Sequence, residues 1–134
     1  MNYLLDTCVV SDFFKKTAAV IEHFELISPR NIYVSTITVM EVEYGLKLNP
    51  EVEKKIRPLW EALLKQIHTL SYSVQCAEAS ALARAVLKKG GLMVGPYDIL
   101  IAGTAIAHGM TMVTSNIKEF ERIPKILIQD WRKK

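Results

Sequence analysis

The amino-acid sequence predicts an α/β fold with three layers, α/β/α, around a mostly parallel sheet of about five strands. Short apolar runs alternate with longer helical patterns along the chain, and this alternation favours parallel strands covered by helices on both faces. Half of the 134 residues are hydrophobic, which excludes a disordered chain. No linker or repeat divides the sequence, so we expect a single domain over residues 1–134.

The first 34 residues contain two strand signals separated by helical patterns. Residues 3–5 form an apolar run that predicts a short buried strand, and a helix is expected to follow through Phe13 and Phe14. Residues 18–27 predict a second helix, and the Ser-Pro-Arg-Asn stretch at 28–31 is typical of a turn. The apolar run at residues 32–34 predicts the second strand.

The middle of the chain predicts two helices and a weaker third strand. Ser35 or Thr38 can cap the first of these helices. Its apolar stripe consists of Ile37, Met40, Tyr44 and Leu48. An Asn-Pro pair at 49–50 ends this helix and opens a second one, in which Pro58 is expected to introduce a kink or a break. Residues 67–70 predict the third strand.

The remaining residues predict two more helices and two more strands. Residues 74–89 carry the clearest helical stripe, and two glycines end it. Pro96 opens an alanine-rich helix that runs to His108, and residues 110–113 and 126–128 predict the last two strands. Ligands of parallel sheets bind beyond the carboxyl ends of the strands, so polar residues that directly follow a strand are candidates for a site.

Three carboxylates stand alone in apolar sequence. Asp6 is the only charged residue in positions 1–11, Glu41 the only one in 31–42, and Asp98 the only one in 90–117 with histidine counted as neutral. Burial of an isolated carboxylate is costly unless a cation or hydrogen-bond donors meet it. A divalent cation would satisfy all three together, and a ligand set of oxygens suits Mg²⁺ or Mn²⁺.

Each carboxylate also has a purely structural explanation. Asp6 follows a strand and can cap the next helix, and Asp98 lies two residues after Pro96, where it favours the helix dipole. Glu41 is harder to explain in this way, because it shares a helical face with the predicted apolar stripe and is expected to point toward the core. Glu43 is expected to face solvent and pair with Lys47 at i+4.

A fourth polar group follows the predicted strand at 110–113. Thr114 and Asn116 lie directly after it, and Glu119 comes three residues later. A turn that ends the strand explains these residue types equally well, and the charged neighbours of Glu119 favour a solvated turn. As a functional group they would supply a hydroxyl, an amide and a carboxylate to the sheet edge that carries Asp6.

The remaining features limit the possible functions. Two cysteines, Cys8 and Cys76, exclude a disulfide scaffold and are expected to be small core residues. The three histidines lack metal-ligand spacing, and the sequence contains no P-loop, nucleophile elbow or dinucleotide fingerprint. The net charge of +3 permits a nucleic-acid partner, and the basic excess lies in residues 68–134, with nine basic against five acidic residues.

No membrane segment or secretory signal is evident. The longest uncharged run is interrupted by glycines, a histidine and an asparagine, and the N-terminal residues lack a basic region ahead of their apolar stretch. We therefore expect a cytoplasmic protein without a membrane partner.

Three motifs resemble those of PIN-domain proteins of the VapC type, the toxins of many prokaryotic toxin–antitoxin pairs. The motifs are YLLDTCVVSDF with Asp6, VSTITVMEVEYGL with Glu41, and GPYDILIAGTAIAHGMTMVTSNIKEF with Asp98. The resemblance extends over essentially the whole chain. It implies a PIN-like sheet of about five strands and a metal-dependent ribonuclease in which these three residues are the central acids.

The resemblance also assigns roles to polar neighbours and implies partners. Thr7 and Thr114 match positions that support the metal and the phosphate, and Glu119 matches a position that is often acidic. Asn116 stands where many relatives have Asp, which favours one bound Mg²⁺ (or Mn²⁺) over two. The implied partners are a homodimer mate, a small antitoxin that covers the active site, and structured RNA such as transfer RNA.

As a hypothesis, Asp6 and Asp98 bind the metal and Glu41 holds or deprotonates the attacking water, while Asn116 or Glu119 completes the metal shell. Three alternatives remain open. A PIN-type nuclease of RNA processing would use the same site, and a catalytically impaired RNA-binding PIN domain would explain Asn116. A receiver-type signalling domain requires an acceptor Asp after the third strand, where the sequence has Leu-Ser-Tyr at 70–72.

Overall fold

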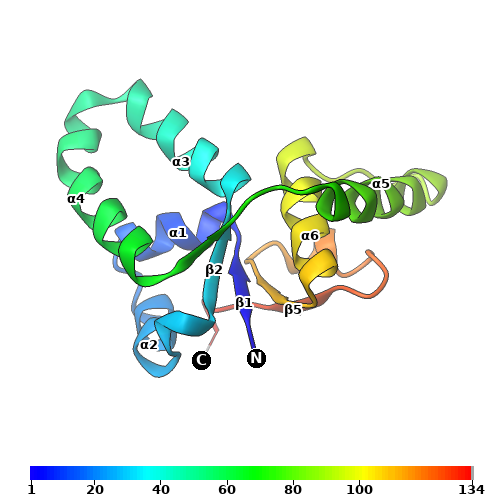
Figure 1. Cartoon of the computed structure of the whole chain (residues 1–134), viewed down its shortest axis with the longest axis horizontal. Helices are drawn as coiled ribbons and strands as arrows, with labels where there is room; N and C mark the ends of the chain where they lie inside the picture. Colours follow the sequence, from blue (N-terminus) through cyan, green and yellow to red (C-terminus); the bar gives the residue numbers. More distant parts are fainter. Residues whose placement is uncertain (134) are drawn as a thin grey trace.

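A five-stranded parallel sheet runs through the centre of the molecule, which we describe from a computed structural model of residues 1–133 (Figure 1). The strands follow the order β3-β2-β1-β4-β5, and every neighbouring pair is parallel. Their bounds are β1 (Tyr3–Leu5), β2 (Ile32–Ser35), β3 (His68–Leu70), β4 (Thr111–Val113) and β5 (Leu127–Gln129). The predicted parallel sheet is confirmed, and β5 begins one residue later than expected.

Helices cover both faces of this sheet, as the three-layer prediction requires. One face carries α1 (Thr7–Phe14), α2 (Ala18–Leu26), the 3-10 turn η1 (Pro29–Asn31), α3 (Thr36–Leu48) and α4 (Pro50–Gln66). The other carries α5 (Val74–Lys89), α6 (Pro96–His108) and the short α7 (Ile117–Phe120). Figure 1 shows α1 to α4 on one side of β1 and β2 and α5 and α6 on the other.

Two apolar cores, one on each face, hold these layers together. Side chains alternate along β1, so Leu5 packs in the core beneath α1 to α4 while Leu4 packs in the core beneath α5 to α7. Trp60 of α4 and Trp131 near the C-terminus are fully buried in the first core, and Met112 and Phe120 are fully buried in the second.

Pro58 was expected to kink or split its helix, and it does not split it. The helix α4 continues through Pro58 from Pro50 to Gln66. Pro58 lies on the exposed surface of α4, where its ring disturbs no core contact, while Trp60 and Leu63 of the following turn are buried. Burial of these large side chains outweighs the one backbone hydrogen bond that proline removes.

The predicted apolar stripe of α3 is wrong. Tyr44 and Leu48 are 63% and 67% exposed, and the helix buries Thr38, Val42 and Leu46 instead. Apolar residues surround this helix almost completely, so their spacing alone does not identify the buried face. Glu41 therefore does not point into the core; it lies half-buried at the edge of the buried face.

The sheet order places a topological switch point at β1 and β4. The chain runs from β1 to β2 and β3 on one side, and β4 and β5 are added on the other side of β1. Ligands of open α/β sheets bind outside the carboxyl ends of the strands at such a point. Residues directly after β1 and β4 are therefore the best placed to form a site.

Close packing of α5 against α6 fixes the second helical layer. A Cβ atom on Gly103 of α6 would lie 1.9 Å from the Ser80 hydroxyl oxygen of α5, so only glycine allows this approach.

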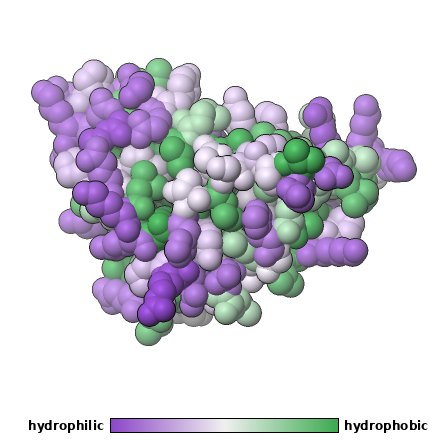
Figure 2. Space-filling model, viewed as in Figure 1, coloured by the Kyte–Doolittle hydropathy of each residue, from purple (hydrophilic) through white to green (hydrophobic). Residues whose placement is uncertain are grey.

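Figure 2 shows hydrophilic residues over the α4 side of the molecule and apolar residues nearer the middle of the same face. Within residues 1–133 no helix is both long enough and apolar enough to cross a membrane.

Candidate active site

Asp6 is held at the carboxyl end of β1 by three hydrogen bonds. Its side chain is only 2% exposed. One carboxylate oxygen, Oδ1, accepts the Thr7 backbone N–H at 2.7 Å and caps α1. The other, Oδ2, accepts the Thr114 hydroxyl at 2.8 Å and the Cys8 thiol at 3.4 Å. The capping explanation for Asp6 is thus confirmed, and it coexists with a fixed carboxylate at the switch point.

Thr7 connects this end of α1 to Glu41 on α3. The Thr7 hydroxyl donates to Glu41 Oε1 at 2.7 Å and lies 3.3 Å from the hydroxyl of Thr38, one turn earlier on α3. Thr38 is completely buried. The contact orients one oxygen of Glu41 and leaves its second oxygen available to a ligand.

Asp98 lies in the first turn of α6, as predicted, and faces the other acids. Burial raises its pKa to about 6, and the charges of Asp6, Glu41 and Glu119 add to this increase. The Asp98 carboxylate packs against Gly95. A Cβ at that position would lie 2.9 Å from Asp98 Oδ2, so a larger residue would crowd the carboxylate. Four carboxylates from β1, α3, α6 and α7 therefore share one region of negative potential.

The turn after β4 completes this region. Thr114 is fully buried, donates its hydroxyl to Asp6 and accepts the Asn116 backbone N–H at 3.1 Å. Asn116 precedes the short helix α7, and Glu119 lies in its first turn. The structure thus brings together six of the residues that the sequence identified and places the backbone of Asn116 beside them. The six are Asp6, Thr7, Glu41, Asp98, Thr114 and Glu119.

Cys8 is a correction to the sequence analysis. Only Cys76 is a buried thiol. Cys8 is half-buried beside Asp6, and its sulfur is 3.5 Å from the Ser115 hydroxyl. Burial and the Asp6 charge raise the pKa of the Cys8 thiol, so it remains protonated and able to donate. The sequence signal was its place two residues after Asp6, on the turn that follows a strand.

The surroundings of Glu43 were predicted only in part. Glu43 does contact Lys47, at 3.6 Å, but its main partners lie on α4. Arg57 donates to Glu43 Oε2 at 2.6 Å and to Oε1 at 2.9 Å, and Trp60 Nε1 donates to Oε2 at 3.0 Å. The Arg57 hydrogen bonds lower the pKa of Glu43 to about 2, and the Trp60 bond adds to this effect. This carboxylate joins two helices.

The donor chemistry of the acid region fits a divalent cation. None of the ion pairs within residues 1–133 involves Asp6, Glu41 or Asp98. In the same residues no three Asp, Glu, His or Cys side chains are close enough to hold a metal ion by themselves. Mg²⁺ is usually bound through one or two carboxylates together with water and substrate phosphate, so Asp6 and Asp98 are enough carboxylates for that mode.

The fold and site together define a class: an α/β domain with an acidic, oxygen-donor site at the switch point of a parallel sheet. Residues 3–126 match the family model of the PIN domain. The chain is 37% identical to the tRNA(fMet)-specific endonuclease VapC of Salmonella typhimurium over 98% of each chain. It is 35% identical to ribonuclease VapC2 of Rickettsia felis, covering 99% of this chain and 100% of the relative.

Solved structures give the same result. A chain in the crystal structure of VapBC2 from Rickettsia felis bound to a promoter DNA fragment matches 98% of this chain and 99% of its own length, with TM-score 0.89 and 32% identity. A chain of DNA-bound VapBC from Salmonella typhimurium matches 98% of both chains, with TM-score 0.89 and 36% identity. The chain belongs to the PIN-domain family, among the VapC ribonucleases.

Proposed function

We propose that this chain is a metal-dependent endoribonuclease and the toxin component of a VapBC-type toxin–antitoxin system. The observation that carries the proposal is the acid region, in which Asp6, Glu41 and Asp98 converge without a cationic side chain to neutralise them. The names of the relatives support RNA as the substrate class. The solved relatives are VapBC assemblies, which supports a cognate antitoxin as the partner.

In this proposal Asp6 and Asp98 hold one Mg²⁺ or Mn²⁺, and Asn116 or Glu119 completes the shell through a bound water. When bound, the metal ion stabilises the charge that develops on the transferring phosphoryl group. The hydrogen bonds from Thr7 and Thr114 hold the Asp6 carboxylate in one orientation at the end of β1, which preorganises it for a ligand. The polar neighbours Thr7 and Thr114 act as positioning residues.

Glu41 is the proposed general base. Thr7 occupies its Oε1, so Oε2 accepts a proton from the attacking water. The water oxygen forms a bond to phosphorus, the bond from phosphorus to the 3′-oxygen breaks, and the leaving oxygen takes up a proton. The products are one RNA end with a 5′-phosphate and one with a 3′-hydroxyl.

The test is cleavage of RNA by the purified protein. We expect cleavage with Mg²⁺ or Mn²⁺, loss of cleavage with EDTA, and loss in Asp6→Ala. Glu61→Ala is a matched control, because Glu61 is an exposed acid on α4. Cleavage that persists in EDTA or in Asp6→Ala would sink the proposal.

The biological part of the proposal has its own test. Expression should arrest growth in the cytoplasm of a bacterial host, and Asp6→Ala or co-expression of a cognate antitoxin should relieve the arrest. We also propose a homodimer, which sedimentation of the purified protein tests. Transfer RNA is the first substrate to try, given the names of two relatives.

One alternative follows from Asn116. An RNA-binding PIN domain with impaired catalysis would bind RNA and leave it intact with either metal. Restoring the acid in Asn116→Asp separates the two proposals. If the unmodified protein is inactive and Asn116→Asp cleaves RNA well, catalysis is impaired by Asn116. If the unmodified protein is active and Asn116→Asp changes its rate little, the nuclease proposal is supported.

A further inference from the structure

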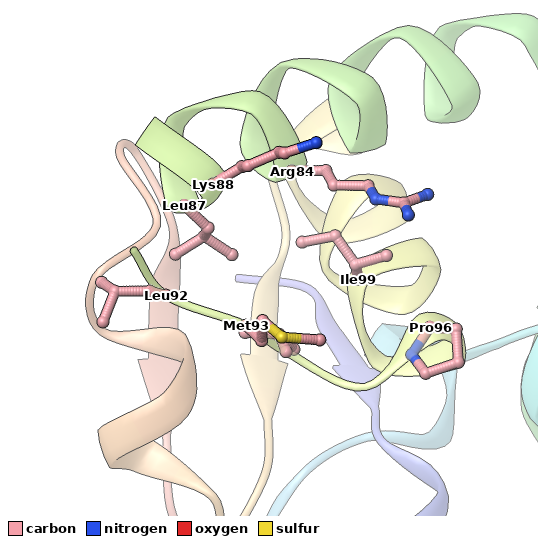
Figure 3. A pocket seen from close by; sticks show the side chains of 8 residues that line it. Arg84, Leu87, Lys88, Leu92, Met93, Pro96 and Ile99 are labelled. Atoms are coloured by element: carbon pink, nitrogen blue, oxygen red, sulfur yellow. The ribbon is translucent and has the colours of Figure 1, made fainter. Parts of the chain in front are cut away.

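A pocket of about 390 Å³ lies between the end of α5, the loop that follows it and the first turn of α6. Its volume falls in the range of small-ligand pockets. Figure 3 shows two cationic side chains extending from α5 along one rim, with apolar side chains around the space next to them. The cations are Arg84 and Lys88, and the apolar wall includes Leu87, Leu92, Met93 and Ile99.

The charge of this pocket is opposite to that of the acid region. Between Glu78 and Asp98 the sequence contains three cations, Arg84, Lys88 and Lys89, and no acid. Within residues 1–133 neither Arg84 nor Lys88 forms an ion pair. Arg84 and Lys88 are four residues apart on α5, so they project from the same side of that helix. Two unpaired cations over an apolar wall suit an anion attached to a flat apolar group.

The pocket adjoins the proposed catalytic centre. Pro96 and Ile99 line it, and Asp98 lies between them in the same helical turn. Asp98 does not itself line the pocket, so the pocket lies beside the acid region, and a strand held at Asp98 would reach it with a neighbouring nucleotide.

We propose that this pocket holds a nucleotide of the RNA that flanks the cleaved phosphodiester, with Arg84 and Lys88 on its phosphate and the apolar wall against its ribose and base. The inference rests on the proposed function and deepens it by assigning a substrate subsite. Phosphate contacts of this kind supply affinity and position the strand, whereas the aliphatic wall contributes apolar contact to the ribose and base.

The first experiment measures RNA binding with no cleavage. In an Asp6→Asn background with Mg²⁺, the binding of labelled total transfer RNA is titrated at several salt concentrations. Adding Arg84→Gln and Lys88→Gln should weaken binding on the order of tenfold and reduce the slope of log Kd against log salt by roughly 0.7, the value for one neutralised phosphate on single-stranded RNA. The matched control, Lys55→Gln with Lys65→Gln on exposed positions of α4, should match its parent.

The second experiment measures cleavage in the otherwise unmodified protein. The Arg84 and Lys88 double variant should raise KM about tenfold and leave kcat within about twofold, because the pocket binds a part of the RNA that does not react. Arg84→Gln alone repeats the test with a smaller change. An unchanged KM, or an equal loss in the α4 control, overturns the subsite.

Failure of the subsite and failure of the proposed function give different results. If the unmodified protein cleaves RNA and the double variant is unaffected, only the subsite is wrong. If the protein binds RNA and cleaves none with either metal, the nuclease proposal fails, and the salt titration still decides the subsite. If only affinity for an acidic partner protein falls, the pocket belongs to that partner and the RNA subsite is overturned.

Discussion

Glu41 and Glu43 lie two residues apart on α3 and have opposite surroundings. Glu43 is matched by cationic and N–H donors from α4, which lower its pKa to about 2. Glu41 receives a neutral hydroxyl from Thr7 and faces the other acids of the site. One carboxylate stabilises the contact between two helices, and the other keeps an oxygen free for a ligand.

The same contrast occurs around α1. Asp6 at its start is buried among hydroxyl, thiol and backbone donors. Asp12, near its end, is also buried and accepts Arg132 Nε at 2.7 Å and a second Arg132 N–H at 3.0 Å. Carboxylates paired with arginine are structural in this molecule, whereas those held by neutral donors converge on one site. Four substitutions test this division.

The largest effect is expected from Asp6→Asn. Asparagine keeps an oxygen to cap α1 but removes the charge, so RNA cleavage should fall on the order of 100-fold or more. Its amide nitrogen cannot accept the Thr114 hydroxyl or the Cys8 thiol, so the free energy of unfolding should fall by only about 1 kcal/mol. Steady-state cleavage and thermal unfolding measure the two effects. Near-normal cleavage in this variant would remove Asp6 from the catalytic centre.

Asp12→Ala should give the reverse result. Removing this buried carboxylate leaves the Arg132 guanidinium without its partner, and we expect a loss of about 2 kcal/mol in the free energy of unfolding, since Arg132 is itself half exposed. Urea unfolding measures the loss. Cleavage at a temperature where the variant is folded should remain near normal, and an active-site role for Asp12 would be indicated if it did not.

Glu43→Gln should cost roughly 1–2 kcal/mol at neutral pH, because Arg57 and Trp60 lose a charged acceptor. The folded pKa of Glu43 is about 2, below its ordinary 4.5. Its contribution is therefore complete above pH 4.5 and is lost as the pH falls toward 2. Stability measured from pH 7 to pH 2 should decline less steeply in the variant, and parallel curves would argue against this pairing.

Asp98→Asn should raise stability while abolishing cleavage. In the metal-free protein the pKa of Asp98 is about 6 against an ordinary 3.8, so the ionised form destabilises the fold. This penalty is absent below pH 3.8, grows through pH 6 and is complete above it. We expect a gain of about 1 kcal/mol at pH 7 in EDTA and none at pH 3.5. An equal gain at both pH values would point to packing rather than charge.

Much of the fold follows from local sequence. The strands that contain Leu4, Val34 and Met112 were predicted because each is a short apolar run between helical patterns, and their parallel pairing follows from that alternation. The buried face of α3 did not follow. Tyr44 and Leu48 are as apolar as Val42 and Leu46, and only the packing of α3 against the sheet and α4 distinguishes them.

The candidate site was predictable where an acid is isolated in apolar sequence, as Asp6 and Asp98 are. The contact of Thr7 with Thr38 and the pairing of Asp12 with Arg132 were not predicted, because the partners lie 31 and 120 residues apart in the sequence. The contact of Glu43 with Lys47 was predicted and is present, whereas Arg57 and Trp60 were missed because they become its neighbours only when α4 folds back. The cationic pocket was not predicted either, because its lining residues come together only when α5 and α6 pack side by side.

The hydrogen bond from Thr114 to Asp6 joins residues 108 positions apart, and it has a consequence for synthesis. β1 and β2 can pair early in translation, but β1 gains its second neighbour, β4, only after residue 113 has been made. A ribosome-bound chain of 100 residues therefore exposes one edge of β1 and has no complete acid region. Because long-range parallel pairing forms slowly, the exposed edge of β1 makes the nascent protein prone to aggregation. The incomplete acid region leaves it without nuclease activity until β4 has been added.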